Sequence, residues 1–359
     1  MKKSLIALAA LAAVGTVSAQ SSVTLYGRMD LGMLVTKTEQ GTRTVKTTSL
    51  AGAEGTRTGN RLGVRGTEDL GGGLRANFNI ETAVNIDRTV PASTFGKVRT
   101  AILQLQGGFG SATIGTYLNT FDDVRGVSVA TAGVAGGDFL AKSFGDNIRG
   151  LGPRSENAIG YRSPSFGGLD FRIGTTYEKA ETNVVTATNP TGLNLTTKTT
   201  GYIGGIGYNN GPISALLALG QGKLSTPAGN GKVNDVAFVA SYNLGVAVPY
   251  IQLESAKGTN TAVVGEVKTT GYELGAKFPL GAFTPHISVS GGKIKTTPTG
   301  LATTEVKTRG FQLGTTYDLS KRTYVYAAAG REKNLAAPLA GGTGDVKGTG
   351  FGLGLVHNF

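Results

Sequence analysis

The chain of 359 residues contains no cysteine, no tryptophan and only two histidines, His286 and His357. Without cysteine, no disulfide framework supports the fold. Acid–base catalysis normally needs a histidine or paired acids set against a nucleophile, yet His286 stands in a Pro-His-Ile segment with no acid nearby. No motif of the GxSxG, HExxH or phosphate-loop type occurs. The sequence therefore predicts no catalytic residue, no metal site and no cofactor.

Long hydrophobic runs are missing after the first 19 residues. Those residues have the positive start, apolar run and small cleavage-site residues of a secretory signal peptide, carried by Lys2–Lys3, Leu5–Val14 and Val17–Ala19. The apolar run is too short for a spanning helix, which needs roughly 20 residues. We therefore expect a cleaved signal peptide, residues 1–19, and one mature domain, residues 20–359. The mature part is either soluble and unusually glycine-rich or meets a membrane as strands.

Basic residues exceed acidic ones, 35 to 23, which gives a formal net charge of +12. They are spread along the chain rather than gathered with stacking aromatic residues in one patch. A nucleic acid is therefore not an expected partner.

Apolar and polar residues alternate through the mature chain. Leu74, Ala76, Phe78 and Ile80 alternate with arginine, asparagine and glutamate, and residues 23–34 and 169–177 follow the same pattern. Successive strand residues point to opposite faces, so each segment predicts a strand with one apolar and one polar face. Alternation alone would also suit a soluble sandwich.

Aromatic residues repeat at a fixed spacing of six, which favours a membrane barrel. The pairs are Tyr202/Tyr208, Tyr272/Phe278, Phe311/Tyr317 and Phe351/His357, each preceded by glycine. Six is even, so both members share the apolar face, about 20 Å apart along the strand. Aromatic residues at two fixed heights indicate the interfacial girdles of a transmembrane barrel.

The pattern predicts an all-β, transmembrane antiparallel barrel of about sixteen strands, an even number as antiparallel closure requires. The expected strands lie near residues 23–36, 60–69, 73–86, 97–107, 110–118, 156–163, 168–179, 199–209, 212–223, 234–244, 247–257, 267–279, 283–294, 307–318, 323–333 and 347–359. The longest gap runs from Asn119 to Ser155, and Thr36–Asn60 reads as a long polar loop. From spacing alone, the longest gap is either a surface loop or a loop folded into the lumen.

The last strand carries Leu353, Leu355, His357 and Phe359 on its apolar face. An alternating end with a final aromatic residue resembles the signal that the outer-membrane assembly machinery recognises. We interpret His357 as an interfacial ring rather than a ligand or base.

Four segments carry a family resemblance: Val23–Gly27 (VTLYG), Asn60–Phe78 (NRLGVRGTEDLGGGLRANF), Asn157–Gly168 (NAIGYRSPSFGG) and Gly354–Phe359 (GLVHNF). They resemble the Gram-negative general porins of the Neisseria, Bordetella and Burkholderia type. The resemblance implies a passive channel for ions and small hydrophilic solutes in the outer membrane, a homotrimer, and a third external loop folded into the pore. It also implies contacts with lipid and lipopolysaccharide, and handling by periplasmic chaperones and the assembly machinery. Gly160 departs from the family, in which a basic residue often stands there.

Several arginines fall at the polar positions of the alternating strands and are therefore expected on the inner face. The resemblance implies a basic wall opposite acids on the loop. The predicted basic wall comprises Arg28, Arg61, Arg65, Arg75, Arg162 and Arg172, and the predicted loop acids are Asp122, Asp123, Asp138 and Asp146. Alternatively, these arginines only pair with Glu68, Asp69 and Glu81 to stiffen the wall. The cluster leads to the hypothesis of a mild anion preference. The alternative functions are a substrate-specific channel, which would need aromatic residues along the pore, and an adhesin-like surface barrel.

Overall fold

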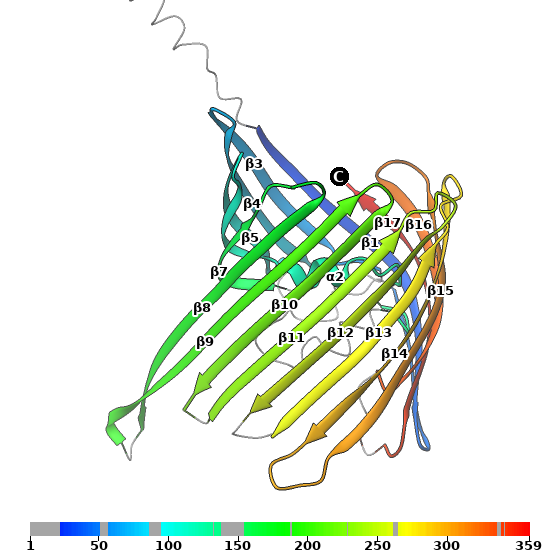
Figure 1. The fold of residues 1–359 in the computed structure, drawn as a ribbon. Coiled ribbons are helices and arrows are strands. Elements are labelled where there is room, and N and C mark those ends of the chain that lie inside the picture. The colour runs from blue at the N-terminus through cyan, green and yellow to red at the C-terminus, as the bar shows by residue number, and fades with distance from the viewer. Residues whose placement is uncertain are drawn as a thin grey trace, which may run out of the picture.

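The computed structural model describes residues 22–50, 57–85, 95–131, 133–137, 154–186, 189–227, 229–260, 265–335, 339–340 and 342–359. Long, tilted strands wrap around a lumen that holds one short helix (Figure 1). Within these ranges no helix is both long enough and apolar enough to cross a membrane.

Seventeen strands form one antiparallel sheet. Their bounds are β1 Ser22–Gln40, β2 Arg43–Leu50, β3 Arg61–Gly71, β4 Leu74–Val84, β5 Phe95–Gly107, β6 Gly110–Leu118, β7 Arg154–Arg162, β8 Leu169–Thr186, β9 Asn189–Asn210, β10 Ile213–Thr226, β11 Gly229–Tyr242, β12 Val248–Asn260, β13 Glu266–Lys277, β14 Phe283–Thr297, β15 Thr304–Asp318, β16 Thr323–Lys333 and β17 Val346–Asn358. The helix, α2, spans Thr120–Arg125.

The sheet closes through β1, which pairs with β3 at its start and with β17 along the rest of its length. With β2 set aside, β1 and β3–β17 form a closed ring of sixteen strands, which confirms the predicted barrel. The last residue completes the closure: Gly27 and Phe359 exchange backbone hydrogen bonds of 3.0 and 3.1 Å. The Phe359 ring covers Gly27, where a Cβ would overlap it.

The first connection differs from the expected loop over Thr36–Asn60. β1 continues to Gln40, turns at Gly41 (φ 58°), and returns as β2, whose Arg43–Leu50 pair with β1. β8 and β9 likewise extend beyond the expected ends into a long hairpin, at the lower left of Figure 1. These extensions are rich in threonine and charged residues, so they have no apolar face and the alternation signal that marks a membrane strand is missing from them.

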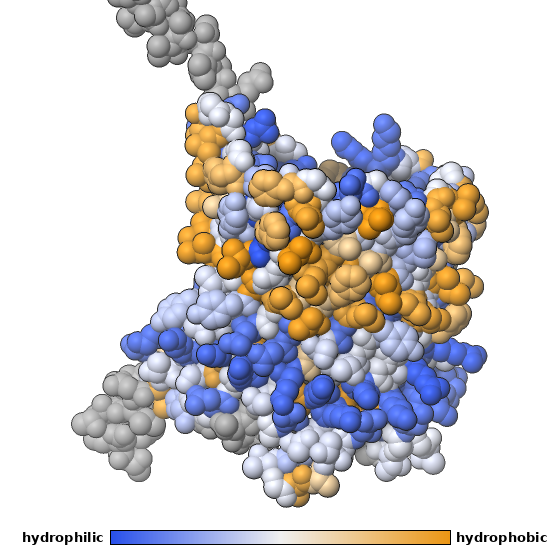
Figure 2. All heavy atoms as spheres, in the orientation of Figure 1, coloured by the Kyte–Doolittle hydropathy of each residue, from blue (hydrophilic) through white to orange (hydrophobic). Residues whose placement is uncertain are grey.

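The outer face of the barrel is apolar, the reverse of a soluble protein. Val23, Leu103 and Ile173 are each 65% exposed or more, and the first aromatic members Tyr202, Tyr272, Phe311 and Phe351 are exposed as well. Figure 2 shows the resulting apolar band across the face of the wall in view. Tight turns such as those at Gly211, Gly245 and Gly281 join neighbouring strands at one end of the barrel, called here the short-turn end. Phe359 also lies at this end. The opposite end is the long-loop end.

Candidate functional site: the lumen beside helix α2

Helix α2 lies inside the barrel, against the inner face of β10 and β11 (Figure 1). Asn119 caps it, since the Asn119 side chain accepts a hydrogen bond of 3.0 Å from the Phe121 amide. Phe121 and Val124 are fully buried in an apolar cluster formed with Ile203, Leu216, Ala218, Val233, Ala237, Val239 and Ala256. The third external loop therefore folds into the lumen, which decides between the two interpretations that spacing left open.

Two strands that contact α2 have apolar residues on both faces, which the alternating pattern alone does not predict. Residues Leu216–Leu219 and Val236–Ala240 are apolar at consecutive positions, so β10 and β11 are apolar on both faces. A lumen-facing position normally meets water, and an apolar run there indicates that something covers the wall from inside. Here the cover is α2.

Buried polar side chains of β12 and β13 hold the residues around the end of α2. Arg125 Nη2 lies 2.6 Å from Glu254 Oε1, and their side chains are only 6% and 0% exposed. The Gln252 amide donates to the Val124 carbonyl at 2.9 Å, and Ser128 Oγ donates to Glu273 at 2.5 Å. These contacts satisfy the open end of the helix and fix it on the wall.

The next segment of the loop is fixed to β15 and β16. Gln312 accepts from the Thr131 amide at 2.5 Å, and its own amide nitrogen donates to carbonyls of the segment at 3.2 to 3.4 Å. Inward-facing glycines on β15–β17 let the loop backbone approach closely, because a Cβ at Gly330 would overlap the Ala135 carbonyl oxygen. Two of these glycines, Gly310 and Gly350, are the ones that precede Phe311 and Phe351 in the repeat.

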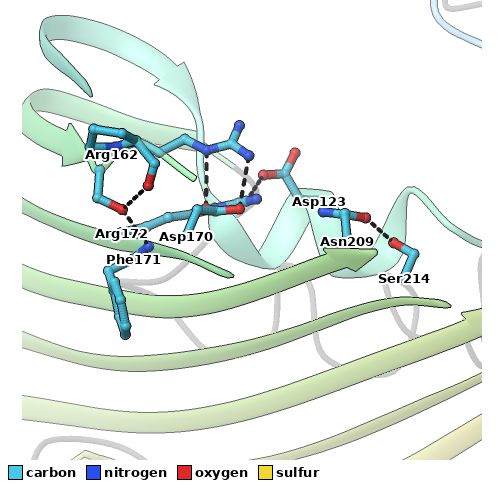
Figure 3. A network of polar contacts seen from close by, with 9 residues as sticks. Asp123, Arg162, Asp170, Phe171, Arg172, Asn209 and Ser214 are labelled. Carbon is cyan, nitrogen blue, oxygen red and sulfur yellow. Dashed lines mark hydrogen bonds and ion pairs between the residues drawn. The ribbon is translucent and has the colours of Figure 1, made fainter. Parts of the chain in front are cut away.

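The neighbouring wall, on β7 and β8, is basic. On β7 and β8, Asp170 accepts from Arg162 Nε at 3.0 Å and from Arg172 Nε at 2.8 Å. Arg172 also donates to Asp123 of α2 at 2.5 Å, so a single chain of charges links the wall to the loop (Figure 3). Asp170, which joins the two arginines, was not selected from the sequence because it reads as one more alternating polar residue.

A second basic group lies on β1, β3 and β5. Arg61 and Arg99 share Glu81, at 3.8 and 2.8 Å. Arg28 lies opposite Arg61 in the register, and its Nε donates to an asparagine rather than an acid, Asn358 Oδ1, at 2.7 Å. The guanidinium of Arg65 lies over the Tyr26 ring, 5.1 Å from its centroid.

Arg75 lies apart from this group. It is opposite Asp69 near the short-turn end, and six residues separate it from Glu81. That separation is roughly 20 Å along the strand. The structure therefore brings together Arg28, Arg61 and Arg65, and separately Arg162 and Arg172, but not Arg75.

Two arginines of the wall, Arg99 and Arg154, were missed by the sequence analysis. β-Bulges interrupt the register between β4 and β5 beside Thr82, and between β6 and β7 beside Gly115. A bulge adds one residue to one strand and shifts its parity, so alternation counted from the strand centre fails beyond it. Arg154 Nε donates to the Arg99 carbonyl at 3.0 Å, which joins the two residues. Together these arginines form the basic wall of the lumen: Arg28, Arg61, Arg65, Arg99, Arg154, Arg162 and Arg172.

Of the predicted loop acids, Asp122 and Asp123 lie in the first turn of α2, while Asp138 and Asp146 fall outside the described residues. Burial raises the pKa of Asp122, and the nearby charge of Asp123 raises it further. Burial also raises the pKa of Asp123, although Arg172 and Arg162 oppose this shift. Both carboxyls therefore take up protons at a higher pH than an exposed aspartate.

Several tyrosines face the lumen, and Tyr26, whose hydroxyl donates to Glu81 at 3.0 Å, is one of them. Tyr117, Tyr250 and Tyr326 face inward too. Tyr250 and Tyr326 are 6% and 3% exposed and donate to the buried acids Glu273 and Asp30 at 2.6 and 2.8 Å. They support the loop and the first connection rather than line a track for a solute.

Between α2 and strands β5–β9 lies a hollow of about 250 Å³. Its lining includes Gln104, Thr113 and Ser155 as well as Arg162 and Arg172. In the part of the chain that the structure describes, no group of three or more histidine, aspartate or glutamate residues could hold a metal ion. The geometry is that of a hydrated passage with a charged wall.

A sequence model of the Gram-negative porin family matches residues 5–337. The chain belongs to the Gram-negative porin family. The outer membrane porin protein 32 of Delftia acidovorans is 35% identical over 285 residues, 78% of this chain and 77% of that protein. An outer membrane porin protein of Bordetella pertussis is 28% identical over the full length of both chains.

Solved structures agree with the fold of this porin. An anion-selective porin from Comamonas acidovorans superimposes with a TM-score of 0.73 at 28% identity, over 95% of this chain and 100% of that one. The trimer form of OmpT from Vibrio cholerae has a TM-score of 0.64 at 14% identity, over 94% and 99%, and shows the fold alone.

The porin is therefore an outer-membrane channel that crosses the membrane many times as strands. Its family and fold point to a channel rather than an enzyme. The short-turn end is the periplasmic end and the long-loop end is the external end, as in barrels of this class.

The last strand presents its predicted face to the outside. Leu353, Leu355 and Phe359 are 42%, 41% and 44% exposed on the outer surface. His357 Nδ1 lies 2.9 Å from Thr323 Oγ1, and its ring stacks on Phe359 with centroids 6.4 Å apart. His357 is thus an outward ring beside another ring, as an interfacial residue would be.

Proposed function

We propose that the porin is a general diffusion channel that prefers anions. The observation that carries this proposal is the pairing of the four arginines on β1, β3 and β5, which share only one carboxylate among the described residues. Arg61 and Arg99 share the single carboxylate of Glu81. Arg28 and Arg65 face an amide and an aromatic ring instead of an acid. Their positive charge is left to act on solutes in the passage.

The loop side supplies the opposite charge. Asp122 and Asp123 lie in the first turn of α2, and Asp123 pairs directly with Arg172 of the wall. Charges of opposite sign on facing walls create a transverse field, which orients dipolar solutes and makes apolar ones give up favourable hydration. The anion selectivity of the Comamonas acidovorans porin, at 28% identity, supports the same sign here.

Two single-charge changes in one cluster test the selectivity. Glu81→Gln leaves Arg61 and Arg99 without their acid and should raise the anion-to-cation permeability ratio in planar bilayers. Arg99→Gln removes a cation from the same place and should lower the ratio. Equal ratios for both variants and the native porin would contradict the proposal.

We also propose that the passage is unspecific. In the described residues the buried lumenal tyrosines are engaged with loop anchors, so no continuous aromatic track is offered to a sugar. Conductance should scale with bulk salt and should not be blocked by millimolar sugars. A saturable block by one solute would favour the substrate-specific alternative.

We propose that three copies of the chain associate through the outer face of β4 and β5. This face stays apolar up to its external end, where Phe95 and Val98 are 56% and 50% exposed. At that height a single barrel would expose these apolar side chains to polar lipid headgroups. Contact with a second copy of the chain would bury them. Val98→Glu should convert a heat-sensitive trimer band to a monomer band on unheated gels, whereas Lys223→Glu on β10 should not. A native protein that migrates and scatters light as a monomer would contradict the proposal.

Export and assembly complete the proposed function. Residues 1–19 would be removed before Gln20, and periplasmic chaperones and the assembly machinery would bind the outward face of Leu353, Leu355, His357 and Phe359. N-terminal sequencing of the membrane protein should begin at Gln20. Phe359→Ala should lower the folded fraction in the outer membrane, while the purified variant should still refold in detergent.

A further inference from the structure

The hairpin of β8 and β9 extends beyond the barrel wall with unpaired strand edges. β7 pairs with β8 only as far as Thr176, while β8 stays paired with β9 up to the contact of Thr186 with Asn189. From Tyr177 to Thr182 every residue is exposed, on both faces of the strand. Figure 1 shows the hairpin leaving the wall at the lower left and running sideways away from the barrel. The hairpin is therefore a two-stranded ribbon outside the closed sheet.

The edge of β8 that faces away from β9 offers backbone groups to a further strand. On the side of β7, the Phe171 carbonyl accepts from the Ser163 amide at 2.9 Å. On the side of β9, the carbonyl of Gly168, directly before β8, accepts from the Asn209 amide at 2.9 Å. Because the two directions alternate along a strand, odd-numbered residues of β8 direct their N–H and C=O groups away from β9. Past the pairing with β7, no described strand meets these groups, and such an edge is a template for pairing with another chain.

The other edge of the ribbon is less suited to pairing. β10 pairs with β9 only from Lys198 onward, so residues 189–197 of β9 also have an open side. Pro190 lies in this stretch and has no N–H to donate. β8 carries no proline from Tyr177 to Thr186, and its register with β9 is regular as far as Val184. The edge of β8 is therefore the one that can pair.

Two charges of opposite sign stand on this edge of β8. Lys179 and Glu181 are two residues apart, so they share one face of the strand, where they form an ion pair of 2.5 Å. Their side chains are 47% and 64% exposed. Lysines alone would repel a second identical edge, which is a common protection of exposed strands. A lysine and an acid at alternate positions instead let two identical edges pair, in a register that sets each lysine opposite an acid.

Only one register of two identical edges meets this condition. Odd-numbered residues carry the free backbone groups, so they must face one another across a two-fold axis that passes through one residue position. With the axis at Lys179 or at Glu181, a charge would face its own copy. With the axis at Ala180, Lys179 of each chain faces Glu181 of the other. Glu178 then faces Thr182, so no like charges meet.

We propose that the edge of β8 pairs antiparallel with the same edge of a second copy of the chain in the same membrane, with the two-fold axis at Ala180. The two ribbons form one continuous sheet, and Lys179 lies between Glu181 of its own chain and Glu181 of the second copy. The sideways course of the hairpin directs it toward a neighbouring barrel (Figure 1). The contact is separate from the apolar face of β4 and β5, so it depends neither on the proposed trimer nor on the ion selectivity.

A single cysteine tests this register, because the chain has none of its own. Residues on the axis face each other with Cα atoms about 4.5 Å apart, which is within the range of a disulfide. Oxidation of full-length mature Ala180→Cys porin with copper phenanthroline, in native outer membranes, should therefore give a covalent dimer on heated, non-reducing gels. Thr182→Cys is the matched control on the same exposed face. Its two copies would lie roughly 13 Å apart along the strands and should give little dimer.

Charge exchange tests the pairing of Lys179 with Glu181. In the Ala180→Cys background, Lys179→Glu sets acid against acid twice in each dimer and should lower the dimer yield about tenfold. Adding Glu181→Lys to that variant exchanges the two charges in both strands and should restore the yield. Labelling of the thiol with a maleimide before oxidation shows that the cysteine is equally accessible in each variant, and a heat-modifiable gel shift shows that each barrel is folded.

Absence of dimer from Ala180→Cys would overturn the proposal. Equal dimer from Thr182→Cys would mean random collision of mobile hairpins and would overturn it as well. A doubly exchanged variant that dimerises as poorly as Lys179→Glu would contradict the register. The gel counts chains joined by a disulfide after heating, and all variants should keep native conductance and reversal potential, so failure here is separable from failure of the proposed trimer or anion preference.

Discussion

Removing the cation of the buried Arg125–Glu254 pair should release α2 from the wall. Arg125 Nη2 lies 2.6 Å from Glu254, both side chains are almost fully buried, and Asp235 lies beside Glu254. Arg125→Met would leave these acids without a cation. Breaking a buried pair in this way typically costs about 3–5 kcal/mol, which lowers the docking equilibrium of α2 roughly a hundredfold to a few thousandfold.

Single-channel recording should report this loss directly. The native channel should show a steady open level, and Arg125→Met should add excess noise and brief partial closures as the undocked loop moves in the lumen. Arg125→Met/Glu254→Met replaces the pair by apolar groups and should restore a quiet trace, because such replacements are often neutral. Lys333→Met breaks an ion pair whose side chains are 42% and 50% exposed, and should change nothing. A quiet, native-like trace for Arg125→Met would refute the reasoning.

Three further outcomes follow from the same geometry. Phe121→Ala empties a fully buried site and should weaken loop docking by about 3–5 kcal/mol, seen as faster protease cleavage within the loop while the barrel stays resistant to SDS. Gly330→Ala places a methyl group against the Ala135 carbonyl and should give the same cleavage pattern, whereas Gly211→Ala, in an open periplasmic turn, should not. Because the pKa of Asp122 and that of Asp123 are both raised, lowering the pH from neutral toward the ordinary aspartate value of 3.8 should protonate them early and increase the anion preference. The variant Asp122→Asn/Asp123→Asn should show that higher preference already at neutral pH. An identical pH profile for native and variant channels would contradict the assignment.

Much of the fold could be predicted from the sequence because lipid requires an apolar residue at every outward position, which is every second residue of a membrane strand. Aromatic residues such as Tyr202 and Phe311 mark the outer face, and strand number and order follow from turns and alternation. This alternation is absent from the parts of the strands that extend beyond the membrane. The polar hairpin of β1 and β2 and the extended ends of β8 and β9 carry no apolar face, so their pairing could not be seen.

The site was predictable only in part. Arg28, Arg61, Arg162 and Arg172 lie on inner faces of regular strands, and Asp123 of α2 pairs with Arg172. Arg99 and Arg154 lie beyond bulges, which local sequence does not mark. The anchors Glu254, Glu273 and Gln312 depend on contacts with residues more than 120 positions away, which no single-strand pattern encodes.

The reversal potential of the purified porin, in a planar bilayer with a tenfold gradient of potassium chloride at neutral pH, tests the central claim most directly. An arginine-rich passage should let chloride diffuse faster than potassium, so the dilute side should become negative relative to the concentrated side. A dilute side that becomes positive would mean that cations pass more readily and would contradict the proposed role of the basic wall.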